Sequence, residues 1–226
     1  MLFRSQMKFH DKTKRILGFI TAFFEPLSVS SLSALLSVDK EELIKTLRKF
    51  HSILDVPQDE HAPLGLVHLS FRDFLLSKER SSKLPFQVEE VSMHQAVFEA
   101  CLSLMSQKLQ QDMCDLVLPG HLASKVPQNQ FERCIPQHLR YAGRYWVDHL
   151  AKLGDDQRQG VGLADNKSVH LFLQEKLLFW LEAMSLMREM SAAILILNKL
   201  AKIIDVSLPS LSLLNLLVTK CAITLF

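Results

Sequence analysis

The stretch SILDV at residues 52–56 marks a change of pattern in this chain. Before it, up to Phe50, apolar residues recur at the three- and four-residue spacing of amphipathic helices. From Ser52 apolar and polar residues alternate, which is typical of a half-buried strand. A polar loop with two prolines follows at 57–65, and LVHL at 66–69 predicts a second strand. Three helices followed by a β-hairpin predict a winged helix.

Local signals set the ends of these three helices. The first is predicted over residues 8–24 and ends before Pro26, because proline breaks a helix. Ser28 is the expected N-cap of the second helix. Asp39 is the expected N-cap of the third, which extends to Phe50, and Glu42 follows Asp39 at capping-box spacing.

The sequence beyond the hairpin is helical in pattern. Helices are predicted over residues 91–109, 137–153, 169–187 and 191–204, with short turns at 116–136 and an exposed loop at 155–165. The predicted fold class is mainly α, a winged helix with a small hairpin followed by an all-helical domain. The domains are a winged helix at 7–80, a helical domain at 86–204 and an apolar tail of uncertain fold at 205–226.

Composition excludes several functions. The 226 residues include seven glycines, about half the usual share, and none is spaced as in a Walker A or dinucleotide-binding loop. An independent enzyme is therefore not expected. The net charge of +2 argues against a nucleic-acid partner. Four cysteines without a C-x-x-C pair predict reduced, mostly buried thiols in the cytoplasm.

The tail and the histidines give weaker signals. Residues 208–226 are apolar but contain Pro209 and Lys220, so they make a poor membrane span and no membrane partner is expected. His138 and His149 are eleven residues apart on one predicted helix, about 16 Å, which is too far for a shared metal. No metal site is predicted, and lone histidines are interpreted as structural.

The segment YAGRYW at 141–146 admits two interpretations. Its aromatic side chains resemble a platform on which bases stack. At helical spacing, however, Tyr141 and Tyr145 share a face, and Gly143 permits close approach of a neighbouring element. Core packing is the favoured interpretation. Arg140 and Arg144 of the same helix are expected to pair with acidic residues elsewhere.

His68 is the candidate functional residue. It stands at the end of the second predicted strand, directly before a helix with Ser70 as its expected N-cap. An imidazole beside the free amides of a helix N-terminus, here at Ser70 and Phe71, is suited to bind phosphate. The alternative is that His68 only bonds to the backbone of the hairpin.

Two motifs and several shorter segments resemble one protein family. VHLSFRDFL at 67–75 resembles the H-x-S-F-x-[DE]-F-L motif of fungal NACHT–WD40 proteins of the heterokaryon-incompatibility type, which are related to animal NOD-like receptors. The segment from LRYA at 139–142 to YWVDHL at 145–150 resembles their downstream Y-A-x-x-Y-W helix. Segments between residues 16 and 57 also match, and the resemblance covers roughly residues 14–204 in order.

The resemblance implies a regulatory role. In the family, the winged-helix histidine reaches the β-phosphate of ADP, so His68 would sense ADP or ATP held by a NACHT ATPase core. Walker motifs and WD40 blades are absent from the sequence, so the core is expected before residue 1 and the repeats after residue 226. The chain is then a non-catalytic fragment that binds no cofactor by itself. Oligomerisation on activation is left open, and the tail after residue 204 departs from the family, as a truncated or mispredicted gene model would.

Two other functions remain open. A winged-helix DNA-binding regulator would present a basic third helix. Residues 39–50 instead mix basic and acidic side chains, namely Lys40, Lys45, Arg48 and Lys49 with Asp39, Glu41 and Glu42. A plain helical protein-interaction module is the other alternative, and it would show no response to phosphate.

Overall fold

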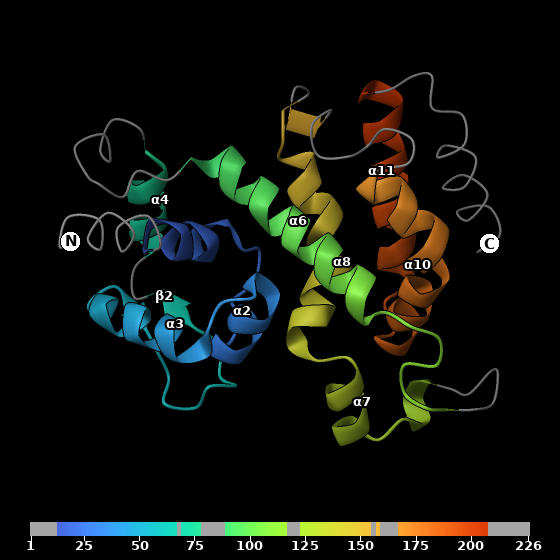
Figure 1. Ribbon diagram of the computed structural model, residues 1–226, viewed down its shortest axis with the longest axis horizontal. Coiled ribbons are helices and arrows are strands. Elements are labelled where there is room, and N and C mark those ends of the chain that lie inside the picture. Colours follow the sequence, from blue (N-terminus) through green and yellow to red (C-terminus); the bar gives the residue numbers. More distant parts are fainter. Residues whose placement is uncertain are drawn as a thin grey trace. The chain divides into compact units, whose positions relative to one another are not determined.

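The computed structural model is mainly helical (Figure 1). It divides into two compact units after Val97, inside helix α6 (Glu90–Lys108). The structure describes residues 13–66, 69–77, 89–116, 123–154, 157–158 and 167–207. The predicted tail at 205–226 therefore lies almost wholly outside the described residues.

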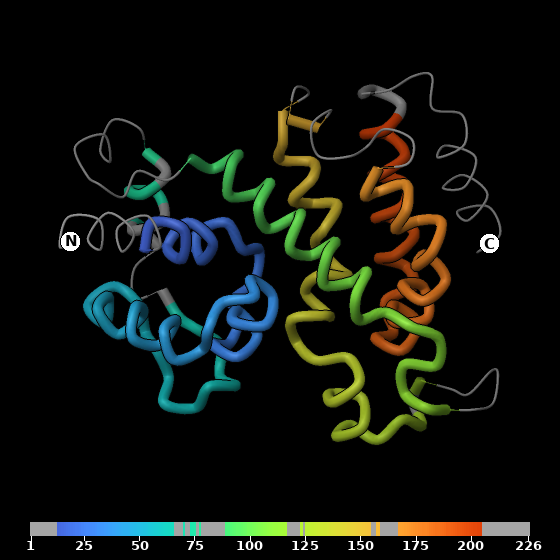
Figure 2. Tube along the Cα trace, in the orientation of Figure 1, coloured from blue at the N-terminus to red at the C-terminus, as the bar shows by residue number. Residues whose placement is uncertain are grey.

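Over its described residues, the first unit consists of helices and one short hairpin. Residues 13–22 are helical and are followed by α2 (Val29–Leu36) and α3 (Lys40–Leu47). A 3₁₀ turn, η1 (Arg48–Phe50), extends α3 to the predicted end of that helix. Next come β1 (Leu54–Asp55), β2 (Gly65–Leu66) and α4 (Leu69–Leu76). The trace of these elements runs from blue to teal in Figure 2.

The predicted caps of α2 and α3 are confirmed. The backbone N–H of Ser31 donates to Oγ of Ser28 at 3.2 Å, and the N–H of Glu42 donates to Oδ1 of Asp39 at 2.9 Å. Each side chain thus satisfies an amide of the first turn, which has no partner within its own helix. α2 ends where Ser37 adopts a left-handed conformation, with φ of 52°.

The predicted strands of the hairpin were too long. β1 pairs antiparallel with β2, with Leu54 opposite Leu66 and Asp55 opposite Gly65. Residues 52–53, predicted as strand, belong to a turn, because the N–H of Ile53 donates to the carbonyl of Phe50 at 2.8 Å. The second strand was predicted at 66–69, but Leu69 already begins α4, and residues 67–68 lie outside the described part of the chain.

Apolar side chains from every helix of the first unit meet in its core. The largest contributions are fully buried aliphatic and aromatic residues, among them Ile16, Leu17, Phe19, Leu27, Leu32, Leu43, Leu47 and Leu54. His94 of α6 stacks on Phe24 with 5.7 Å between the ring centroids. His94 and Val97 are both buried, so the first turns of α6 contribute to the core of the first unit.

The second unit is helical throughout its described residues. After α6 it contains η2 (Ala123–Lys125), α7 (Gln128–Cys134), α8 (Gln137–Ala151), α10 (Ser168–Leu186) and α11 (Met190–Ser207). The bounds of α6, α8, α10 and α11 agree with the predicted helices to within three residues. α7 is a short helix in the segment where turns were predicted. Of the loop predicted at 155–165, only residues 157–158 are described, and they are helical.

Aromatic residues fill the core of the second unit. Trp146 of α8 meets Phe172 and Trp180 of α10 edge to face, with centroid distances of 5.4 and 6.3 Å. Such tilted pairs add to the free energy gained by burying the rings. α8, α10 and α11 pack against one another around this core. Within the described ranges, no helix is both long and apolar enough to span a membrane.

Candidate functional site

The start of α4 is the site that the sequence predicted, and the structure describes it in part. His68 lies outside the described residues. Ser70 is exposed in the first turn of α4. The prediction that Ser70 is the N-cap was wrong, because Leu69 is already helical. Phe71 is in the same turn of the backbone. The helix therefore starts directly after position 68, and its first amides lie beside that position in the chain.

The loop before β2 is held by the start of α2. Both the backbone N–H and the hydroxyl of Ser30 donate to the carbonyl of Glu60, at 3.2 and 3.1 Å. Further along, the N–H of Leu64 donates to the carbonyl of Leu27 at 3.0 Å. Because β2 and α4 follow directly, these bonds constrain the chain that leads into position 68.

The exposed face of α3 carries paired charges. Nζ of Lys40 lies 2.6 Å from Oε2 of Glu60, and this hydrogen bond and charge raise the pKa of the lysine. Nζ of Lys45 lies 3.9 Å from the carboxylate of Glu41. A helix that binds DNA in the major groove needs basic side chains directed at phosphates and bases. Two of the basic residues of this helix face acids instead.

Tyr141 and Trp146 of the aromatic segment of α8 belong to the core, as the favoured interpretation predicted, whereas Tyr145 is half-buried. Tyr141 and Trp146 are fully buried, so neither presents a face on which a base could stack. Nε1 of Trp180 donates to the carbonyl of Gly143 at 3.1 Å. The hydroxyl of Tyr141 lies 2.8 Å from Nε2 of His149.

Two histidines of α8, His138 and His149, are partly or fully buried. His149 is fully buried and bonds to Tyr141. His138 is half-buried, and burial followed by the charge of Lys108 lowers its pKa. Within the described part of the chain, no group of three metal-ligating side chains lies together. His121 lies outside the described residues.

The cysteines resemble packing residues more than reactive ones. Burial raises the pKa of Cys101 strongly. Burial, with a hydrogen bond to Cys134, raises the pKa of Cys114 to about 12. Because the thiolate is the reactive form, these two thiols are poor nucleophiles at neutral pH. Cys134 is half-buried, and all three are free thiols, as predicted.

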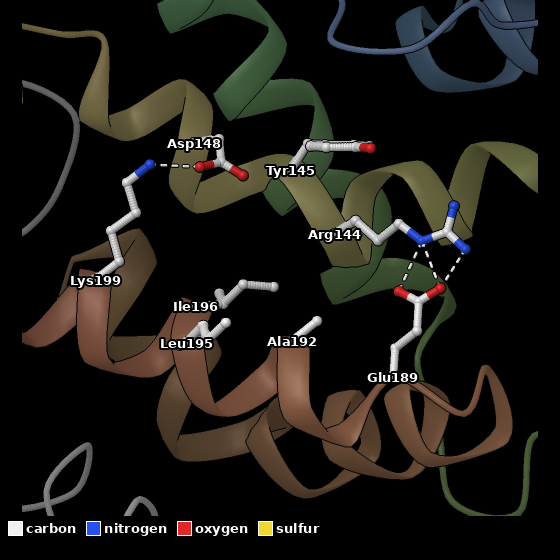
Figure 3. Close-up of a pocket in the computed structure, with 8 residues that line it drawn as sticks. All are labelled: Arg144, Tyr145, Asp148, Glu189, Ala192, Leu195, Ile196 and Lys199. Carbon is white, nitrogen blue, oxygen red and sulfur yellow. Dashed lines mark hydrogen bonds and ion pairs between the residues drawn. The ribbon is translucent and has the colours of Figure 1, made fainter.

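A groove that the sequence did not predict runs between α8 and α11 (Figure 3). We call it the α8–α11 groove, and its volume is about 400 Å³. Its lining residues are Arg144, Tyr145 and Asp148 of α8, with Glu189, Ala192, Leu195, Ile196 and Lys199 at and along α11. The middle of the groove is apolar on its α11 side, and its ends are charged.

An ion pair joins the two walls at each end of this groove (Figure 3). Nε of Arg144 donates to both carboxylate oxygens of Glu189, at 2.9 and 2.8 Å, which confirms the expected acidic partner. At the other end Nζ of Lys199 bonds to Asp148. Arg140, for which an acidic partner was also expected, lies over the ring of Phe131 at 5.4 Å from its centroid.

The sequence and the structure of the chain can be compared with those of known proteins. No family model matches the chain, and no solved structure matches it significantly. The chain is similar to a fungal incompatibility protein. It is 31% identical over 201 residues to the vegetative incompatibility protein HET-E-1 of Podospora anserina. The match covers 80% of this chain and 14% of HET-E-1, so the chain spans a small part of that relative.

The similarity to HET-E-1 agrees with the resemblance found in the sequence. Both point to fungal incompatibility proteins. Because the match covers 80% of this chain, most of the described residues lie within the part that aligns with HET-E-1. The match therefore relates this chain to one region of HET-E-1.

Proposed function

We propose that this chain is a non-catalytic regulatory region of a fungal NACHT-type NTPase. The observation that carries the proposal is the 31% identity to HET-E-1 over 201 residues. Residues 7–80 would form a winged helix and residues 86–204 a helical domain. The partners would be a NACHT ATPase core and a repeat domain such as WD40, both supplied by the full-length protein.

In this proposal His68 contacts the β-phosphate of ADP bound to the NACHT core. The position of α4 supports it, because this helix begins at Leu69 and its first amides follow position 68 directly. A histidine beside a diphosphate makes a charge-assisted hydrogen bond in the closed state, which the open state lacks. Loss of that bond would shift the population towards the open state.

Nucleotide binding by four proteins tests this proposal. They are the isolated chain, the chain joined to the NACHT core of a fungal relative, and the joined protein with His68→Ala or His61→Ala. His61 is an exposed histidine of the same unit and serves as a matched control. The isolated chain is expected to bind ADP negligibly. In the joined protein, His68→Ala should weaken ADP binding about 10- to 100-fold, the value of one charged hydrogen bond.

The control should bind ADP as the unsubstituted joined protein does. Tight ADP binding by the isolated chain would contradict the proposal, since the phosphate cradle is assigned to the core. Unchanged ADP affinity in the His68→Ala protein would contradict the role of His68.

A further inference from the structure

The α8–α11 groove has an exposed apolar residue at its rim. Leu195 lines the groove and yet 70% of its surface is accessible in the described chain. Ala192 and Ile196 lie next to it on the same wall (Figure 3). Exposed apolar side chains beside a hollow, with charged groups around them, are the layout of a protein interface.

Four of the five residues on the α11 side of the groove lie in two symmetric pairs. Glu189 and Lys199 are each five positions from Ile194, and Ala192 and Ile196 are each two positions from it. Glu189 belongs to the same helical path, because its carbonyl accepts from the N–H of Ala193 at 2.9 Å. A two-fold axis that passes beside α11, at the level of position 194, would therefore place each member of a pair opposite the other member in a second copy. The outer pair spans about 15 Å along the helix.

The charges of the groove are complementary under this symmetry. One end carries Arg144 and Glu189, and the other carries Asp148 and Lys199. A second copy related by the two-fold axis would place its Lys199 opposite Glu189 and its Asp148 opposite Arg144. Each ion pair within one chain would then lie beside an ion pair of the other copy. The four charges would form a group in which every positive charge has negative neighbours. A parallel arrangement would set like charges against each other, which is unfavourable.

The apolar centre fits the same arrangement. Leu195 is one position from the axis, so the two Leu195 side chains would lie next to each other between the antiparallel helices. The small side chain of Ala192 permits close approach, and Ile196 and Tyr145 form the adjacent surface. An apolar centre with a charged rim is the layout that excludes water from the middle of an interface.

We propose that the α8–α11 groove binds a second copy of this chain, in an antiparallel two-fold dimer centred on position 194 of α11. The contact is confined to one face of two helices, so the association is weak, with a dissociation constant in the micromolar range. The proposal is independent of nucleotide and of His68. It concerns only the second unit, and it can fail while the proposed regulatory function holds.

Sedimentation equilibrium of the full 226-residue chain provides the first test. The unsubstituted chain should dimerise at submillimolar concentration, and Leu195→Glu should abolish the dimer by placing two carboxylates near the axis. Leu178→Glu is the matched control. Leu178 is 74% exposed on α10, outside the groove, so this variant should dimerise normally. Equal far-ultraviolet circular dichroism of the three proteins excludes misfolding as the cause.

A charge exchange tests the antiparallel geometry. Lys199→Glu alone sets the new carboxylate against Glu189 of the second copy, and Glu189→Lys alone sets the new ammonium group against Lys199. Each variant alone should dimerise on the order of tenfold more weakly, because two attractive contacts become repulsive. An equimolar mixture restores both contacts, so heterodimers should form with nearly the affinity of the unsubstituted chain.

Three results would overturn the proposal. The first is an unsubstituted chain that stays monomeric at submillimolar concentration. The second is a Leu195→Glu variant that dimerises as well as the Leu178→Glu control. The third is a mixture of the two charge variants that associates no better than either variant alone, because this result excludes the crossed pairing of Glu189 and Lys199.

Discussion

Tyr141 and His149 form a hydrogen-bonded pair two turns apart on α8, with 2.8 Å between the tyrosine hydroxyl and Nε2. Both side chains are fully buried, so neither exchanges this bond for one with water. Tyr141→Phe should lower the free energy of unfolding by about 1–3 kcal/mol. Chemical denaturation of Tyr141→Phe, His149→Leu and the double variant measures the coupling. If the two single effects simply add, the bond contributes nothing to stability.

The two tryptophans of the core should respond differently to replacement by phenylalanine. Both are buried, and both substitutions leave a similar cavity. Trp180→Phe also removes the donor to the carbonyl of Gly143, whereas Nε1 of Trp146 has no hydrogen-bond partner among the described residues. Trp180→Phe should therefore be the more destabilising by about 1 kcal/mol. Equal midpoints of urea unfolding for the two variants would contradict this expectation.

Gly143→Ala should stabilise the chain. A Cβ at this position would lie 3.6 Å from Nε1 of Trp180 and 3.7 Å from Sδ of Met184, which are ordinary contact distances. Since glycine inside a helix costs roughly 0.5–1 kcal/mol relative to alanine, the substitution should raise stability by a similar amount. Thermal unfolding checks the sign. A lower melting temperature would mean that α8 and α10 pack more closely at this point than the structure indicates.

Glu182 ties α10 to the turn after α6. Its carboxylate accepts from the backbone N–H of Asp112 at 3.2 Å and from that of Met113 at 3.0 Å. Glu182→Ala should cost about 1–3 kcal/mol in unfolding free energy, because two amides lose a charged acceptor. Glu175→Ala, at an exposed position of the same helix, should change stability by less than about 0.5 kcal/mol. Similar losses in both variants would show that general helix effects dominate.

Local signals were predicted well and distant contacts were not. Ser28 and Asp39 cap their helices through bonds that span three residues, so the sequence contains both partners. The strand at 52–56 was predicted too long because its alternation continues into a turn, which the bond from Ile53 to Phe50 closes. An acidic partner for Arg144 was expected from charge, but Glu189 is 45 residues away and no local pattern identifies it.

The groove shows the same limit of sequence reasoning. It forms where α8 packs against α11, two helices that are far apart in the sequence. The paired positions of α11 about residue 194 therefore identify a groove only once the packing of the two helices is known. The 70% exposure of Leu195 is a property of the packed unit.

ADP affinity of the joined protein, with and without His68→Ala, tests the central proposal most directly. Isothermal titration calorimetry or competition with a fluorescent ADP would measure it for the chain joined to a fungal NACHT core, with His61→Ala as control. If this chain has the proposed regulatory role, His68→Ala alone should raise the dissociation constant for ADP about 10- to 100-fold. Identical ADP affinity in all three proteins would contradict the assignment of His68 as the residue that senses nucleotide.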